Sequence, residues 1–123
     1  MKVLIVDDSQ IMRKIITGVL KKLKVNDTIE AINGQEAVEK AGEHEDIGLI
    51  LMDWNMPVMN GLDAVRQIRA SGNKVPIVMC TTEAEKERVL EAVKAGTNDY
   101  LVKPFNPKDI QNKLGKYLPA CTA

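Results

Sequence analysis

A chain of 123 residues has room for one domain and can bury about two-thirds of its unfolded surface, so it needs no disulfides for stability. Seventeen basic and seventeen acidic side chains cancel, which argues against a general nucleic-acid binder. The two cysteines lack the spacing of a zinc site, and no apolar run approaches the ~20 residues of a membrane span. We therefore expect a single cytoplasmic domain over residues 1–123, monomeric, without a membrane segment or an attached output domain.

Taken in chain order, short apolar runs alternate with segments whose apolar residues recur at helical spacing. The run over 2–6 is continuous, as in strands buried on both faces of a parallel sheet, and Asp8 or Ser9 can cap the helix after it. Gly96 is a stop signal for a later helix. The expected strands and helices alternate over 2–6, 10–23, 28–31, 35–41, 47–52, 62–70, 75–80, 83–95, 100–102 and 107–117. This alternation predicts an α/β fold with a five-stranded parallel sheet covered on both faces.

Polar residues follow four of the predicted strands where these strands end. In an open α/β sheet, ligands bind beyond the carboxyl ends of the strands. Each residue alone has an ordinary explanation, such as a helix cap or a solvated lysine, but together they bring three carboxylates, a hydroxyl and an ammonium to one edge. The residues are Asp7, Asp8, Asp53, Thr81 and Lys103. Crowded carboxylates repel one another unless a cation lies among them, and an all-oxygen set suits Mg²⁺ better than zinc.

The same groups fit phosphoryl transfer, in which catalysis consists largely of positioning and neutralising the phosphoryl oxygens. Carboxylates are known covalent acceptors of phosphoryl groups. Asp53 is the expected acceptor, because it begins a long loop in which Asn55 and Gly61 leave the backbone free. Asp7 and Asp8 precede a helix and are expected to hold the metal.

Five segments resemble, in the same order, the motifs of response regulator receiver domains, and the likeness covers essentially the whole chain. They are Val6-Asp7-Asp8-Ser9, Met52-Asp53-Trp54-Asn55-Met56-Pro57, Asn60-Gly61, Cys80-Thr81-Thr82 and Lys103-Pro104-Phe105. Within the family, the likeness is greatest to the stand-alone receivers of chemotaxis. The resemblance implies a doubly wound, flavodoxin-like (βα)5 domain with strand order 2-1-3-4-5. It also implies a two-component signalling switch that a chemotaxis-type histidine kinase phosphorylates with Mg²⁺, and that binds a flagellar motor switch protein. A phosphatase is an optional further partner.

The resemblance also assigns roles to individual residues. Those implied to bind Mg²⁺ are Asp7, Asp8, Asp53 and, through its backbone carbonyl, Asn55. Those implied to hold the phosphoryl oxygens on Asp53 are Lys103, Thr81 and Thr82. Those implied in the conformational switch and its partner surface, on the fourth helix, fifth strand and fifth helix, are Thr81, Val89, Tyr100, Val102 and Phe105. Asn55 and Glu83 would tune the lifetime of the phosphoryl group.

Other functions remain as alternatives. A phosphorelay intermediate would share every motif and differ only in passing the group to a second histidine. An aspartyl-phosphate phosphatase would want two acids spaced by one residue and a covering insertion, whereas Asp7 and Asp8 are adjacent. A histidine phosphocarrier would have to use His44, which lies between two glutamates. We therefore expect a switch that acts only on its own phosphorylation, and not an enzyme with a separate substrate.

Overall fold

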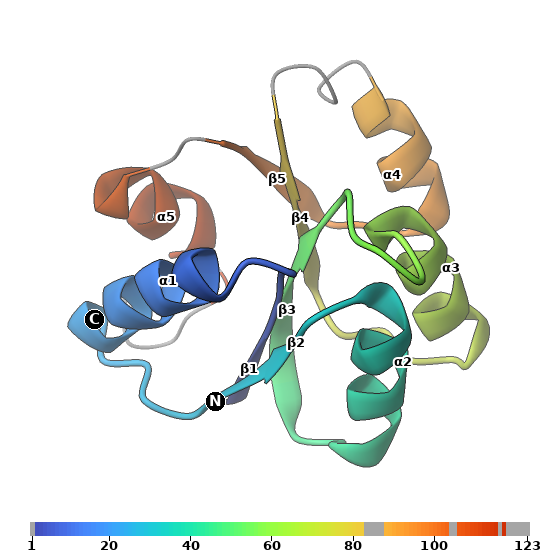
Figure 1. Ribbon diagram of the computed structural model, residues 1–123, viewed down its shortest axis with the longest axis horizontal. Helices are drawn as coiled ribbons and strands as arrows, with labels where there is room; N and C mark the ends of the chain where they lie inside the picture. Colours follow the sequence, from blue (N-terminus) through green and yellow to red (C-terminus); the bar gives the residue numbers. More distant parts are fainter. Residues whose placement is uncertain (1, 83–87, 104–105, 116, 118–123) are drawn as a thin grey trace.

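The computed structural model describes residues 2–82, 88–103, 106–115 and 117. Along the chain these residues form β1 (Lys2–Val6), α1 (Gln10–Lys22), β2 (Thr28–Ala31), α2 (Gly34–Glu43), β3 (Ile47–Asp53), α3 (Gly61–Ala70), β4 (Ile77–Thr81), α4 (Val89–Ala95), β5 (Asp99–Val102) and α5 (Pro107–Leu114). The strands form one parallel sheet in the order β2-β1-β3-β4-β5. Figure 1 shows α1 and α5 on one face of this sheet and α2, α3 and α4 on the other. The expected fold and strand order are confirmed.

Several element bounds differ from those expected. β4 begins at Ile77 and not at residue 75, because Pro76 has no N–H for the ladder and the N–H of Val75 donates to Asn73 Oδ1 over 3.0 Å. α5 ends at Leu114 and not at 117, because Gly115 follows and glycine is a poor helix former. The expected start of the fourth helix at residue 83 lies outside the described residues. Among the helices that are described, none combines the length and apolar character needed to cross a membrane.

The sheet separates two hydrophobic clusters, and alternate residues of each strand point into different ones. In β1, Leu4 and Val6 belong to the cluster beneath α2, α3 and α4, whereas Val3 and Ile5 belong to the cluster beneath α1 and α5. All four are at most 2% exposed. Burial on both faces explains why the sequence of β1 is a continuous apolar run. It also fixes the register of β1, which places Asp7 at the carboxyl end of the sheet.

Arg69, on α3, ties together three segments at the end of the sheet opposite to Asp7. Its guanidinium donates to Gly96 O (2.9 Å), to Asn73 O (3.0 Å) and to Asn98 Oδ1 (3.0 Å). Burial lowers the pKa of Arg69. Gly96 ends α4 with a φ of +118°, a left-handed conformation that glycine adopts without a Cβ penalty, so the predicted stop signal is confirmed.

Gly61 allows the first turn of α3 to lie directly against the end of β3. Its N–H donates to Trp54 O over 2.8 Å, and a Cβ there would collide with the backbone oxygen of Asp53.

We expect Gly61→Ala to lower the free energy of unfolding by about 1–3 kcal/mol, as overpacked sites commonly do. Urea denaturation measures this. The matched control is Gly18→Ala in α1, where an added Cβ meets open space, and it should raise stability by about 0.5–1 kcal/mol. Equal effects of the two substitutions would contradict the close contact.

Candidate functional site at the carboxyl end of the sheet

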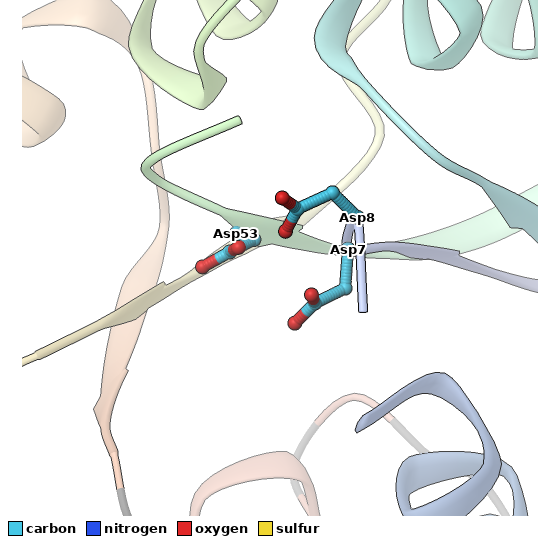
Figure 2. Close-up of side chains that lie close together, drawn as sticks. All are labelled: Asp7, Asp8 and Asp53. Carbon is cyan, nitrogen blue, oxygen red and sulfur yellow. The ribbon is translucent and has the colours of Figure 1, made fainter. Parts of the chain in front are cut away.

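Three carboxylates meet where β1 and β3 end side by side. Val6 of β1 pairs with Met52 of β3, so the next residues, Asp7 and Asp53, are neighbours at the sheet edge. Asp7, Asp8 and Asp53 each offer an oxygen, and these atoms lie within 4.8 Å of one another (Figure 2). Asp7 is 2% and Asp53 8% exposed, whereas Asp8 is exposed. The predicted convergence of these three acids is therefore present in the structure.

Lys103 reaches the same site from the far side of β4. Its Nζ lies 2.8 Å from Asp53 Oδ1 and 3.1 Å from Asp7 Oδ2, and its side chain is 18% exposed. Its backbone N–H donates to Thr81 O over 2.6 Å, which fixes the chain as it leaves β5. One ammonium thus bridges two nearly buried carboxylates, and charge-assisted hydrogen bonds of this kind are among the strongest in proteins.

The site holds more negative than positive charge. Burial raises the pKa of Asp53, and the charge of Asp7 adds to this, while Lys103 opposes it. Burial alone would lower the pKa of Lys103, but the hydrogen bonds and charges of Asp53 and Asp7 together outweigh it and raise that pKa. Both shifts favour the protonated forms, which are a neutral Asp53 carboxyl group and a charged Lys103 ammonium. A divalent cation among the three acids would supply the missing charge, and the oxygen donors suit Mg²⁺.

The turn after β1 aims Asp7 inward and leaves Asp8 outside. Asp7 Oδ1 accepts from the N–H of Ser9 over 2.8 Å, and Ser9 Oγ accepts from the N–H of Met12 over 3.3 Å. Ser9 is therefore the residue that caps α1, and Asp8 is not. Because Asp8 has no part in the cap, its exposed carboxylate stays available at the mouth of the site.

Arg13 supports this turn, and the sequence reasoning missed it. Its Nη1 donates to the backbone oxygen of Asp7 over 2.7 Å, and its Nε donates to Glu30 Oε1 over 2.8 Å. It links α1 to β2 and to the end of β1. A signal did exist, since a cation in the first turns of a helix opposes the helix dipole and needs a compensating partner.

The loop after β3 leads away from Asp53 through a buried tryptophan. The N–H of Trp54 donates to Asp53 Oδ1 over 3.0 Å, and Trp54 is 1% exposed. The Arg88 guanidinium lies 4.9 Å from the centre of its ring. Asn55 follows and is exposed. Val58 has a φ of +68°, which costs a β-branched residue about 1–2 kcal/mol. Such strain is often found beside functional sites.

The expected switch residues lie on β4 and β5. Thr81 ends β4, is fully buried, and its hydroxyl donates to Leu101 O at a long 3.5 Å, while Thr82 after it is exposed. Tyr100 pairs with Met79 and Val102 pairs with Thr81, so the alternation of side chains puts Thr81 and Tyr100 on the same face of the sheet.

The remaining predicted switch residues are only partly covered by the structure. Val89, the first residue of α4, is half-buried, as are Tyr100 and Val102. Glu83 and Phe105 lie outside the described residues.

A groove of about 530 Å³ opens between β5 and α5, away from the carboxylates. Its lining consists of Asp99, Tyr100, Leu101, Val102, Asp109, Asn112 and Lys113. β5 is an edge strand, so all four of its residues contribute to the lining. The groove therefore lies on part of the surface that was expected to bind a partner.

Known proteins are similar to this chain in sequence and in fold. Residues 3–115 match the response regulator receiver domain family. Chemotaxis protein CheY1 of Helicobacter pylori (strain J99) is 48% identical over 116 residues, which cover 93% of this chain and 94% of that protein. The chemotaxis protein CheY homolog of Campylobacter jejuni (serotype O:23/36) is 47% identical and covers 93% and 89%. The solved structure of the chemotaxis response regulator CheY4 of Vibrio cholerae matches with a TM-score of 0.86 at 36% identity, covering 95% of this chain and 98% of that one.

A doubly wound parallel sheet with three acids and a lysine at its carboxyl edge defines a signalling domain of the receiver class. With the family match over nearly the whole chain, this protein belongs to the response regulator receiver domain family. Its relatives place it among the chemotaxis response regulators of the CheY kind.

Proposed function

We propose that this chain is a phosphorylation switch in chemotaxis, which accepts a phosphoryl group on Asp53 from a histidine kinase and then binds the flagellar motor switch in the cytoplasm. The single observation that carries the proposal is the Lys103 ammonium between Asp53 and Asp7, at 2.8 and 3.1 Å, in a site short of positive charge. A bound cation would supply the missing positive charge and, together with Lys103, would neutralise the oxygens of an incoming phosphoryl group.

The geometry of Asp53 favours one oxygen as the nucleophile. Oδ1 accepts hydrogen bonds from Lys103 and from the N–H of Trp54, which leaves Oδ2 with the freer lone pairs. Oδ2 attacks phosphorus, the bond from phosphorus to the histidine nitrogen breaks, and its electron pair stays on that nitrogen, so that an imidazole protonated on its other nitrogen leaves as a neutral group. The Lys103 ammonium then neutralises a phosphoryl oxygen, and this interaction holds the acyl phosphate beside β4.

Asp7, Asp8 and Asp53 would hold Mg²⁺, together with the backbone carbonyl of Asn55. When bound, Mg²⁺ supplies positive charge for the phosphoryl oxygens. Buried Asp7 is oriented by Ser9 and Lys103, and exposed Asp8 can reorient toward an arriving ion. Thr81 and the amide of Thr82, at the end of the adjacent strand, complete the groups near the phosphoryl oxygens.

Phosphorylation would reach the partner surface through Thr81 and Tyr100. Among the residues that the structure describes, the Thr81 hydroxyl has one acceptor, Leu101 O, at a long 3.5 Å, so a phosphoryl oxygen would be a better acceptor for it. Its movement would free space on the face that it shares with Tyr100, whose ring then turns inward. The surface of α4, β5 and α5, with Val89, would change shape accordingly. Asn55 and Glu83 would set how long the signal lasts.

The test is to treat the purified protein with acetyl phosphate and Mg²⁺, with and without a chelator, and to record intact mass at short times. We expect one phosphoryl adduct that requires Mg²⁺. The phosphorylated chain is then offered to the flagellar motor switch protein and, separately, to a histidine phosphotransfer domain. Binding to the former supports the proposal. Transfer of the group to the latter without switch binding would instead identify a phosphorelay intermediate, and the absence of any adduct would refute the chemistry.

Mg²⁺ is also expected to stabilise the unphosphorylated protein. At 100 times its dissociation constant, a ligand specific to the native state adds about 2.7 kcal/mol to the free energy of unfolding. Asp8→Asn, at an exposed position, should remove most of this gain without destabilising the metal-free protein. Thermal melts over a Mg²⁺ series measure the effect. Asp27→Asn, an exposed acid before β2, is the control and should respond like the wild type.

A further inference from the structure

One lysine of α5 makes two contacts at the open edge of β5, and neither belongs to the carboxylate site. Lys113 Nζ lies 3.1 Å from Asp99 Oδ1 and 4.9 Å from the centre of the Tyr100 ring. The same Asp99 oxygen accepts from the N–H of Tyr100 over 2.8 Å. Asp99, Tyr100 and Lys113 thus form a closed triangle, which we call the edge contact, and all three residues line the groove between β5 and α5.

The edge contact joins the two faces of the sheet. Tyr100 packs against the cluster beneath α2, α3 and α4, whereas α5 covers the other face (Figure 1). The Lys113 ammonium can therefore meet the Tyr100 ring only around the free edge of β5, with the ring near that edge. A ring that turns inward would move away from this edge and so from the ammonium.

The edge contact is also well sheltered. The Asp99 side chain is 13% and the Lys113 side chain 34% exposed, less than in the surface ion pair between Arg66 and Asp63. Partial burial weakens the screening of a charge pair by water, and an ammonium over an aromatic face adds a further attraction. The arrangement stabilises one position of the Tyr100 ring.

We propose that Asp99 and Lys113 are positioning residues, which hold Tyr100 at the edge of β5 and so favour the unphosphorylated state. The inference rests on the proposed function, because it takes Tyr100 as the residue that turns inward when Asp53 is phosphorylated. Since linkage is reciprocal, whatever holds Tyr100 outward weakens the binding of a phosphoryl group at Asp53. Breaking the edge contact therefore strengthens that binding, although Lys113 and Asp53 do not touch.

The experiment measures the affinity for beryllofluoride, a stable phosphoryl analogue, with Mg²⁺ by calorimetry. We expect Lys113→Met and Asp99→Asn to bind it about three- to tenfold more tightly than the wild type, the range for a contact of this kind. Lys113→Arg keeps the positive charge beside Asp99 and over the Tyr100 ring, so it should bind beryllofluoride with the wild-type affinity. Lys108→Met is the matched control, since it removes an exposed lysine of the same helix that does not line the groove.

A second readout separates positioning from a general loss of stability. The ring-proton shifts of Tyr100 in the unphosphorylated protein should move toward their beryllofluoride-bound values in Lys113→Met, but not in Lys108→Met. Unchanged affinity and unchanged ring shifts in both edge variants, with a wild type that binds normally, would overturn this inference alone. A wild type that binds no beryllofluoride with Mg²⁺ would overturn the proposed function, and the inference with it.

Discussion

Asp53→Asn is expected to abolish the phosphoryl adduct formed from acetyl phosphate and Mg²⁺, with a loss of more than about 100-fold in rate. The amide keeps the shape of the side chain but removes the nucleophilic carboxylate. The reaction is followed by intact mass in the same time course for both proteins. Asp27→Asn, which removes a remote exposed acid, should be phosphorylated like the wild type.

The stability of this variant separates lost chemistry from lost folding. Burial raises the pKa of Asp53, which means that the ionised carboxylate is unfavourable in the Mg²⁺-free protein. A neutral side chain should therefore raise the free energy of unfolding without Mg²⁺ and reduce the gain from adding it. An adduct that persists in Asp53→Asn would place the acceptor elsewhere, with His44 as the next residue to replace.

Lys103→Met should have the second large effect, on stability and on chemistry together. Without the ammonium, Asp7 and Asp53 remain nearly buried and unpaired, and removing one partner of a buried pair commonly costs about 3–5 kcal/mol. Because the proposed function also places Lys103 beside the incoming phosphoryl oxygens, phosphorylation should slow by about 100- to 1,000-fold. Denaturant melts and the mass assay measure the two effects. Lys74→Met, at an exposed lysine, is the control.

The pH dependence of this loss has a definite sign. Lys103 opposes the upward shift of the Asp53 pKa more than any other group, so in Lys103→Met that pKa rises further above its ordinary value of 3.8. The native state then binds a proton more tightly than the unfolded chain does. Stability should recover as the pH falls through the raised pKa of Asp53, and the recovery should be complete below 3.8. A deficit that stays constant between pH 7 and pH 4 would show that Lys103 acts by packing and not by charge.

The site could be anticipated from the sequence because it is built from strand ends. A parallel sheet brings the residues after its strands to one edge, so Asp7, Asp53, Thr81 and Lys103 could be placed together from a list of apolar runs. The contacts between them could not be anticipated. Nothing in the spacing of Lys103 shows that its side chain passes β4 to reach two carboxylates at once.

The sequence analysis missed contacts in which a long side chain links separate elements. Arg13 reaches the backbone of Asp7, and Lys113 reaches around the edge of β5 to Tyr100. Periodicity reports which face of a helix is apolar, but it carries no information on where a flexible charged side chain ends. The predicted start of β4 was wrong for a local reason. The prediction gave more weight to the apolar character of Val75 than to the missing N–H of Pro76.

Arg69 makes one end of the sheet more resistant to local opening than the other. Its three hydrogen bonds join the corners before β4 and before β5, so these corners open only if the guanidinium loses several partners together. In hydrogen exchange, the amides of Ile77 and Asn98, which bond across this corner, should be among the slow ones, whereas the turn around Asp8 should exchange early. The end of the sheet that Arg69 holds would then resist local opening more than the end that carries the three carboxylates.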